Sequence, residues 1–200
     1  ASEDVVLYHY DYHDLHITVH THHIQLNSLS IPQSTPLVLA AASKQFLLTA
    51  TRTQVSLYQI EPSSLNLLQS HQTTFDVSAL SIVSMNETPI YCICEWITNS
   101  VSIYMGDSLY QTYSFQSPIF SCILTLIPFD NQSLPYLMLS HIDGVIRVFA
   151  LTNKTWKEEK SFHITKYAGT WIPSTDPSIL LLAGFKSCFL YRKNASWLYV

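Results

Sequence analysis

Apolar residues recur along this chain in short, strand-sized runs that are separated by polar turns. Four segments share one pattern, in which an apolar strand, a short polar turn and an alternating strand follow one another. Alternation with a period of two residues is typical of a half-buried β-strand. The segments start 44, 46 and 43 residues apart, and they are "FLLTATRTQVSLYQI" from Phe46, "IYCICEWITNSVSIYM" from Ile90, "YLMLSHIDGVIRVFAL" from Tyr136 and "ILLLAGFKSCFLYRK" from Ile179.

Each hairpin is preceded by another apolar segment, and the first three are followed by a more polar strand. The predicted unit is an inner strand, a hairpin of two middle strands and a polar outer strand. A four-stranded unit that repeats every 40–45 residues or so is the signature of a β-propeller blade. A β-sandwich also has many short strands, but it gives no reason for three nearly equal spacings. We predict an all-β chain with four-stranded blades of about 45 residues, part of a seven-bladed propeller.

The repeat also predicts the domain organisation. Residues 1–35 form the end of a preceding blade, 36–75, 76–117 and 118–166 form three blades, and 167–200 form a partial blade. Within the third blade, Asp143 and Gly144 are the strongest turn signal, because Asp-Gly accepts the positive φ angles of a tight hairpin. Since the chain ends after a middle strand at "SWLYV", we expect it to be part of a longer propeller.

The stretch "YHYDYHDLHITVHTHHIQL" holds six of the nine histidines. His9, His13, His16 and His20 would line one face of a helix and could hold zinc there. From Leu15 onward, however, the residues alternate with period two, which favours a strand. The repeat places the end of a blade here, so we predict a strand over residues 16–26. Exposed polar side chains are then expected, and a surface zinc site on His16, His20 and His22 remains the alternative.

Composition narrows the classes of function. The chain is 48% hydrophobic and 12% charged, with a net charge of −4, so it is predicted to fold and to lack a basic surface for nucleic acid. Its apolar runs are too short to span a membrane. The four cysteines are Cys92, Cys94, Cys122 and Cys188. They form no C-x-x-C motif, and we predict that they are reduced and buried.

Several segments resemble a known family. "WITNSVSI", which contains Trp96, Ser100 and Val101, resembles the W-x-x-x-S-V-x-I strand pair in the large subunit of the UV-damaged-DNA-binding complex. "DVSALSIV" resembles the acidic-Val-x-Cys-Leu-x-Ile inner strand of that family, with Ala79 where cysteine is usual. "SLYQIEPSSLNLLQS" is similar to its Leu-x-x-Leu-x-Ile hairpin and the strand that follows.

Two later segments extend the resemblance. "LMLSHIDGVIRVFAL" is similar to the Asp-Gly hairpin of the family, with Ile142 where the family tends to have glycine, and "AGTWIPS" is similar to a Gly-Thr-x-Pro segment with Pro173 shifted by one residue. Order and spacing match from about residue 37 to residue 200. The family also includes the large cleavage-and-polyadenylation subunit and a splicing-factor subunit. The resemblance implies a divergent fungal member of the repair or heterochromatin-silencing type, with this chain in the second of three propellers.

The expected function is that of a non-enzymatic scaffold. We find no catalytic, cofactor-binding or metal-binding set of residues in the sequence, and Asp143 beside Ser140 and His141 is explained by the turn. Three Pro- and Ser-rich loops are candidate interaction sites. They lie around Pro32, around Phe129, Asp130 and Asn131, and around Asp176. Trp96, Ser100, Asp143 and Gly144 are expected to be structural, with the ring of Trp96 in the core between blades.

What the resemblance implies about partners is a nuclear complex, most directly a cullin-type ubiquitin ligase linked to DNA repair or chromatin silencing. This segment itself is expected to contact neither nucleic acid nor membrane. Two alternatives remain. One is an RNA-processing scaffold of the same family, and the other is an extracellular glycoprotein. The second rests on four N-x-S/T sequons, which begin at Asn86, Asn131, Asn153 and Asn194.

Overall fold

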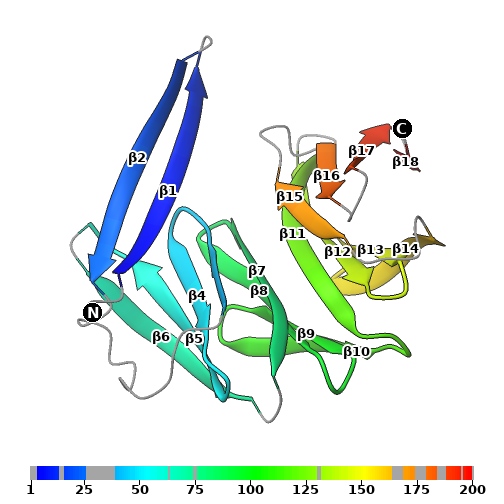
Figure 1. Ribbon diagram of the computed structural model, residues 1–200, viewed down its shortest axis with the longest axis horizontal. Helices are drawn as coiled ribbons and strands as arrows, with labels where there is room; N and C mark the ends of the chain where they lie inside the picture. Colours follow the sequence, from blue (N-terminus) through cyan, green and yellow to red (C-terminus); the bar gives the residue numbers. More distant parts are fainter. Residues whose placement is uncertain are drawn as a thin grey trace. The chain divides into compact units, whose positions relative to one another are not determined.

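The computed structural model describes residues 4–13, 16–25, 39–62, 64–73, 76–129, 132–163, 169–173, 179–183, 188–194 and 196–199. The chain divides into two compact units, Ala1–Pro36 and Leu37–Val200. All the regular structure in the described residues is β-strand (Figure 1). This confirms the predicted all-β class. In the same residues there is no helix that could cross a membrane.

The first unit contains the histidine-rich stretch as an antiparallel hairpin. Strand β1 (Asp4–His13) pairs with β2 (His16–Gln25), and His9 lies opposite His20 in the register. The prediction of a strand from residue 16 is confirmed. A helix that carries four histidines on one face is excluded, because those residues lie on two extended strands. The spacing of the histidines was compatible with a helix or a strand, and the alternation of β-branched residues correctly indicated a strand.

The second unit contains four antiparallel sheets, and in each sheet neighbouring strands follow one another along the chain (Figure 1). The first sheet consists of β3 (Leu39–Ala42), β4 (Phe46–Ala50), β5 (Gln54–Ile60) and β6 (Leu65–Gln72). The second consists of β7 (Val77–Met85), β8 (Thr88–Glu95), β9 (Ser100–Met105) and β10 (Ser108–Ser114).

The third sheet consists of β11 (Ile119–Phe129), β12 (Gln132–His141), β13 (Val145–Thr152) and β14 (Thr155–His163). The fourth consists of β15 (Thr170–Pro173), β16 (Ile179–Ala183), β17 (Cys188–Asn194) and β18 (Ser196–Tyr199). The fourth sheet therefore has four strands, where the sequence predicted a partial unit that ends in a middle strand. The short segment "SWLY" pairs with β17 as its last strand.

Successive sheets pack face to face, and this explains the continuous apolar runs of the second strands. In β8, Tyr91 and Ile93 join a core with Phe46 and Leu48 of the first sheet. The alternate residues of β8 point to the other face and join a core with the third sheet. The third and fourth sheets share a further core, which includes Met138 and residues Ile146, Val148, Trp171 and Leu182. A strand that is buried on both faces needs apolar residues at every position.

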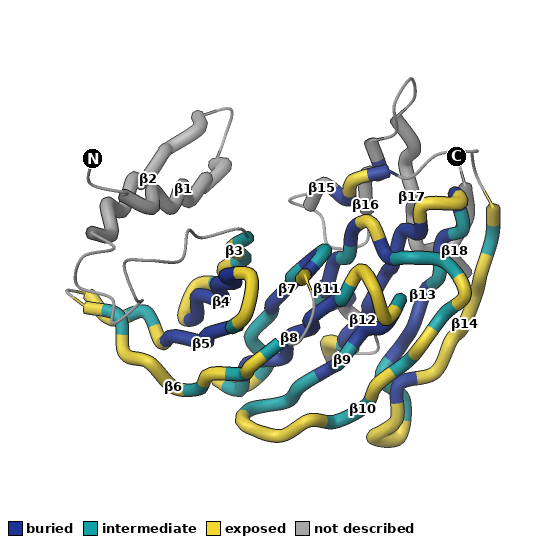
Figure 2. The backbone as a smooth tube through the Cα atoms, turned by 60° about the horizontal axis from the view of Figure 1, so that its bottom comes forward, coloured by how far each residue is buried: buried dark blue, intermediate teal, exposed yellow. Residues whose placement is uncertain are grey.

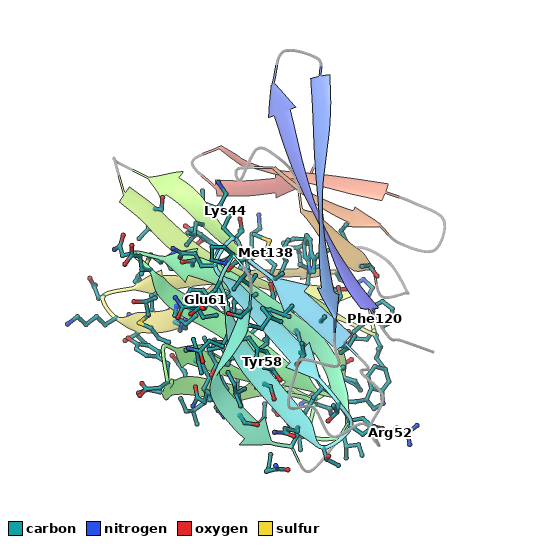
Figure 3. The ribbon with its side chains drawn as sticks, turned by 90° about the vertical axis from the view of Figure 1, so that its left-hand side faces the viewer. Lys44, Arg52, Tyr58, Glu61, Phe120 and Met138 are labelled. Atoms are coloured by element: carbon teal, nitrogen blue, oxygen red, sulfur yellow. The ribbon has the colours of Figure 1, made fainter. Side chains whose placement is uncertain are left out.

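In the first three sheets, the second strands are the most buried and the last strands are the least buried. Strands β4, β8 and β12 are almost entirely buried, while β6, β10 and β14 are mostly exposed (Figure 2). The first strands of successive sheets contact one another. Met138, labelled in Figure 3, is 1% exposed, whereas Arg52 at a hairpin turn is exposed. The predicted polar last strand is confirmed in the described residues of the first three sheets, whereas the second strands, rather than the first, are the most buried.

The hairpin turns use residues that accept a left-handed backbone. Gly144 has a φ of 84°, and the Asp143 carboxylate accepts a hydrogen bond of 3.1 Å from the Val145 amide. The positive φ angle that the Asp-Gly pair predicts is therefore confirmed at Gly144. Two further hairpins turn through pairs of positive φ angles at non-glycine residues, Asn86–Glu87 and Asn153–Lys154. Such pairs are typical of the two-residue turns that match the strand twist.

The structural role predicted for Trp96 is wrong. Trp96 lies in the turn between β8 and β9, and 41% of it is exposed, so its ring does not fill the core between sheets. The neighbouring Ser100 is buried, as a structural residue should be, and its hydroxyl lies 2.7 Å from that of Thr98. The last buried residue of β8 is Cys94 and the strand ends at Glu95, so Trp96 falls two residues beyond the last buried position.

Candidate functional site

Three cysteine side chains converge between the second and third sheets. Cys92 and Cys94 lie on β8, Cys122 lies on β11, and all three sulfur atoms are within 4.8 Å of one another. The Sγ atoms of Cys92 and Cys122 are 3.5 Å apart. All three are free thiols. We call this group the three-cysteine cluster.

The strands bring the cysteines together for simple geometric reasons. Residues two apart on a strand point to the same face, so Cys92 and Cys94 both face the third sheet. Strand β11 crosses this face, and the Leu124 amide donates a hydrogen bond of 2.8 Å to the Ser81 hydroxyl of β7. Because Ser81 pairs with Cys92 and Ala79 with Cys94, β11 is held at the level that places Cys122 against both.

The surroundings of the cluster are apolar. Its neighbours in the same core are the buried side chains of Ala79, Ile90, Val101, Ile103, Ile119, Leu124, Leu137, Leu139, Phe149 and Trp156. Cys92 and Cys94 are fully buried, and Cys122 is partly exposed. Among the described residues, these three cysteines are the group whose side chains could together hold a metal ion.

Burial and hydrogen bonding shift the pKa values of the three thiols in different directions. Burial raises the pKa of Cys94, and hydrogen bonds to its two neighbours, together with burial, raise the pKa of Cys122. At Cys92 burial also acts to raise the pKa, but hydrogen bonds with Cys122, Cys94 and the Ser81 backbone outweigh it and lower the pKa to about 5. The thiolate is the form of cysteine that binds metals.

The sequence predicted buried, reduced cysteines but no metal site. Burial is confirmed for Cys92 and Cys94, while Cys122 is partly exposed and the side chain of Cys188 lies outside the described residues. The shared face of Cys92 and Cys94 was visible in their spacing. The approach of Cys122 was not, because it depends on how β11 packs against β8.

A second feature is an apolar surface at one end of the second and third sheets. It consists of Trp96 (41% exposed), Ile97 (63%), Phe120 (43%) and Ile142 (39%), which we call the strand-end surface. Trp96 and Ile97 lie in the turn after β8, and Ile142 lies in the turn after β12. Phe120 lies at the start of β11 and is labelled in Figure 3.

Backbone hydrogen bonds show that these residues share one end of the sheets. The Trp96 amide donates to the Asp76 carbonyl just before β7, and the Ile142 amide donates to the Pro118 carbonyl just before β11, both at 3.1 Å. The ring of Phe115, just after β10, lies 4.9 Å from that of His141, the last residue of β12. Because neighbouring strands are antiparallel, β10 ends where β7 starts and β12 ends where β11 starts, so the starts of β7 and β11 lie on the same side. The turns after β8 and β12 therefore lie at the same end of the two sheets as the starts of β7 and β11.

The residues that could suggest a catalytic triad are bound to the backbone instead. The Nδ1 atom of His141 lies 2.9 Å from the Ser117 carbonyl, and the Ser140 hydroxyl accepts a hydrogen bond of 3.2 Å from the Gly169 amide. The Asp143 carboxylate caps its own turn, as described above. In this arrangement Ser140 helps to hold the chain before β15 against the third sheet.

A polar aromatic group lies on the opposite face of the second sheet. The Nε2 atom of His71, on β6, lies 2.7 Å from the Tyr91 hydroxyl, and the rings of Tyr91 and Tyr104 stack with centroids 4.8 Å apart. Burial lowers the pKa of His71 and raises that of Tyr104. The Tyr91 hydroxyl also donates to the Gln69 side chain, so the group joins the outer strand of the first sheet to the second sheet.

The residues named for the three candidate interaction loops lie outside the described residues or at their edge. Pro32, Asp130, Asn131 and Asp176 lie outside the described residues, and Phe129 ends β11 with its side chain outside them. Two of the four sequon asparagines, Asn86 and Asn153, are exposed in hairpin turns, whereas Asn194 is the last residue of β17 rather than part of a loop.

No known protein-family model and no curated protein matches this chain.

Proposed function

We propose that this chain is part of a β-propeller that acts as a non-enzymatic scaffold and binds a protein partner through the strand-end surface. The observation that carries this proposal is the grouping of Trp96, Ile97, Phe120 and Ile142, all exposed, at one end of two stacked sheets. Large apolar side chains that gather on a rigid surface are typical of protein–protein contacts.

The arrangement of the sheets supports the propeller. Four meander sheets follow one another along the chain, and the described cores lie between successive sheets. Repeating this packing around an axis would give a closed ring, which we propose to have seven blades. In such a ring the turns after the second strands lie on one face, where they are free to bind while the sheets supply rigidity.

The sequence resemblance supports the choice of partner. It favours a nuclear complex built on a cullin-type ubiquitin ligase that acts in DNA repair or chromatin silencing. An RNA-processing assembly of the same family is the alternative within that resemblance. A stable contact of this kind buries roughly 1,200–2,000 Å² in total, and a few apolar or aromatic side chains dominate its energy.

An extracellular glycoprotein is the alternative from another class, and one observation favours it. Asn86 and Asn153 head sequons in exposed hairpin turns, where a glycan would have room. Mass measurement of the protein from its native host would separate the two, since added hexose would contradict the nuclear scaffold.

The test compares charged substitutions at two exposed apolar sites. Ile97→Asp with Ile142→Asp changes the strand-end surface, and Leu67→Asp with Leu68→Asp changes β6, where both leucines are similarly exposed. Both double variants should keep the β-sheet circular dichroism spectrum and the melting temperature. In pull-downs from nuclear extract, the first should lose the partner at least tenfold and the second should retain it.

The identity of the recovered proteins decides between the proposals. Recovery of cullin-ligase or chromatin components supports the leading one, and recovery of RNA-processing factors alone supports the family alternative. Equal binding by both double variants would show that the strand-end surface is not the contact. Recovery of secretory proteins alone would end the nuclear proposal.

A further inference from the structure

We infer that Cys92, Cys94 and Cys122 form a binding site for one soft monovalent ion, Cu(I), which links the second sheet to the third. The inference rests on three convergent sulfur atoms, all within 4.8 Å of one another, that come from two different sheets. It goes beyond the proposed scaffold function and is independent of it, because the cluster lies inside the core and the strand-end surface lies outside.

The distances suit a three-coordinate ion. A metal–sulfur bond of about 2.3 Å places three ligand sulfurs roughly 4.0 Å apart around a trigonal centre. The Sγ atoms of Cys92 and Cys122 are now 3.5 Å apart, and the remaining separations lie within 4.8 Å. Shifts of less than about 1 Å would therefore seat an ion of this size at the centre of the cluster.

The kind of ion follows from the donor set. Thiolates are soft ligands that select Cu(I), zinc or iron–sulfur clusters. Zinc requires a fourth ligand, and in the described part of the chain the group holds three ligating side chains with apolar neighbours around them. Cu(I) accepts three sulfur ligands without a fourth.

The charge of the filled site depends on how many of the three cysteines bind as thiolates. When two cysteines bind as thiolates, their two protons pass to solvent, and the third binds through a neutral thiol. The site then carries one net negative charge, which is less costly to bury than the charge of three thiolates. No oxidation or reduction takes place, provided that copper is supplied as Cu(I).

The experiment measures Cu(I) binding under anaerobic, reducing conditions, in competition with bathocuproine disulfonate. The expected result is one Cu(I) per chain, with a near-ultraviolet thiolate-to-copper absorption band and a melting temperature that rises with the free Cu(I) concentration. Cys92→Ala and Cys122→Ala should each weaken binding by more than about 100-fold, since even changes outside the ligand set commonly cost 10–100-fold.

Cys188→Ala is the matched control, because Cys188 lies on β17 in the fourth sheet. It should leave the stoichiometry and the affinity unchanged. Circular dichroism of each apo variant checks that it folds, and the wild-type titration tests the inference even if a variant does not. Absence of the absorption band and of any thermal shift in the wild-type protein would overturn the site. So would unchanged binding in folded Cys92→Ala and Cys122→Ala, or a one-to-one Zn²⁺ complex that excess Cu(I) does not displace.

Discussion

Two tryptophans of this chain lie in very different environments, so they should contribute differently to the free energy of unfolding. Trp156, the second residue of β14, is 1% exposed and joins the core between the second and third sheets, whereas Trp96 is 41% exposed in a turn. Replacing a buried tryptophan by alanine costs roughly 3–5 kcal/mol. We expect that loss for Trp156→Ala and less than about 1 kcal/mol for Trp96→Ala, since surface substitutions usually change little. Urea denaturation of the two variants measures both values. A large loss at Trp96 with none at Trp156 would contradict the observed burial.

His141 makes the stability of the fold depend on pH. It is 1% exposed, its Nδ1 atom is paired with the Ser117 carbonyl, and its Nε2 atom has no hydrogen-bond partner among the described residues. Burial lowers its pKa; the Ser117 hydrogen bond acts in the opposite direction, as do Asp143 and Glu158, while Arg147 lowers the pKa further. The folded state therefore takes up the proton at a lower pH than the unfolded state does, for which the pKa is about 6.5.

The sign of the effect follows from that difference. The contribution of His141 is fully present above the unfolded pKa, and it is lost as the pH falls from about 6.5 toward the lower folded value. The free energy of unfolding should thus decrease between about pH 7 and pH 5. His141→Asn keeps a donor for the Ser117 carbonyl but does not titrate, so its stability should fall less over this range. Since the pKa of His71 is also lowered, some slope should remain. An identical slope in both proteins would show that His141 does not cause it.

At the scale of the element, the second strand of each sheet is the most sheltered. Residues 46–49, 90–94 and 136–139 are buried, and their strands pair with a neighbour on either side. We expect their amides to exchange most slowly with deuterium, and those of β6, β10 and β14 to exchange faster. Mass spectrometry of hydrogen exchange at fixed pH would measure this order. Faster exchange in β8 than in β10 would contradict the assignment of middle and outer strands.

The strands could be predicted from the sequence because each one carries its own signal. Continuous apolar runs mark β8 and β12, and Asp143 with Gly144 marks the turn after β12. The turn at Asn86 and Glu87 was harder to recognise, because its positive φ angles occur without glycine. Trp96 shows a different limit. A tryptophan at the end of an apolar strand has the same local pattern whether its ring turns into the core or out to solvent.

The three-cysteine cluster could be predicted only in part, and the reason is physical. Cys92 and Cys94 share a face by the period of the strand, whereas Cys122 joins them through packing between two sheets. Such packing depends on contacts distant in sequence, including the bond between Leu124 and Ser81, 43 residues apart. The strand-end surface could not be predicted from the sequence for the same reason, because its residues come from the turns after β8 and β12 and from the start of β11.

For the second unit as a whole, stability should be distributed over several cores, because each described core lies between two successive sheets. Adjacent residues of one strand can test this. Leu139 faces the core shared with the second sheet, and Met138 faces the core shared with the fourth. Both are almost completely buried. In an ordinary two-layer sandwich, one face of each sheet is open to solvent, so only one of two adjacent residues would be essential.

Leu139→Ala and Met138→Ala should therefore each lower the free energy of unfolding by about 2–5 kcal/mol. Their effects should be nearly additive in the double variant, because the two side chains lie in separate cores. The exposed Leu67→Ala serves as the control and should cost less than about 1 kcal/mol. Chemical denaturation followed by tryptophan fluorescence measures all four proteins. If Met138→Ala were as mild as the control, the fourth sheet would not cover this face, and the stacking on which a propeller depends would fail at that point.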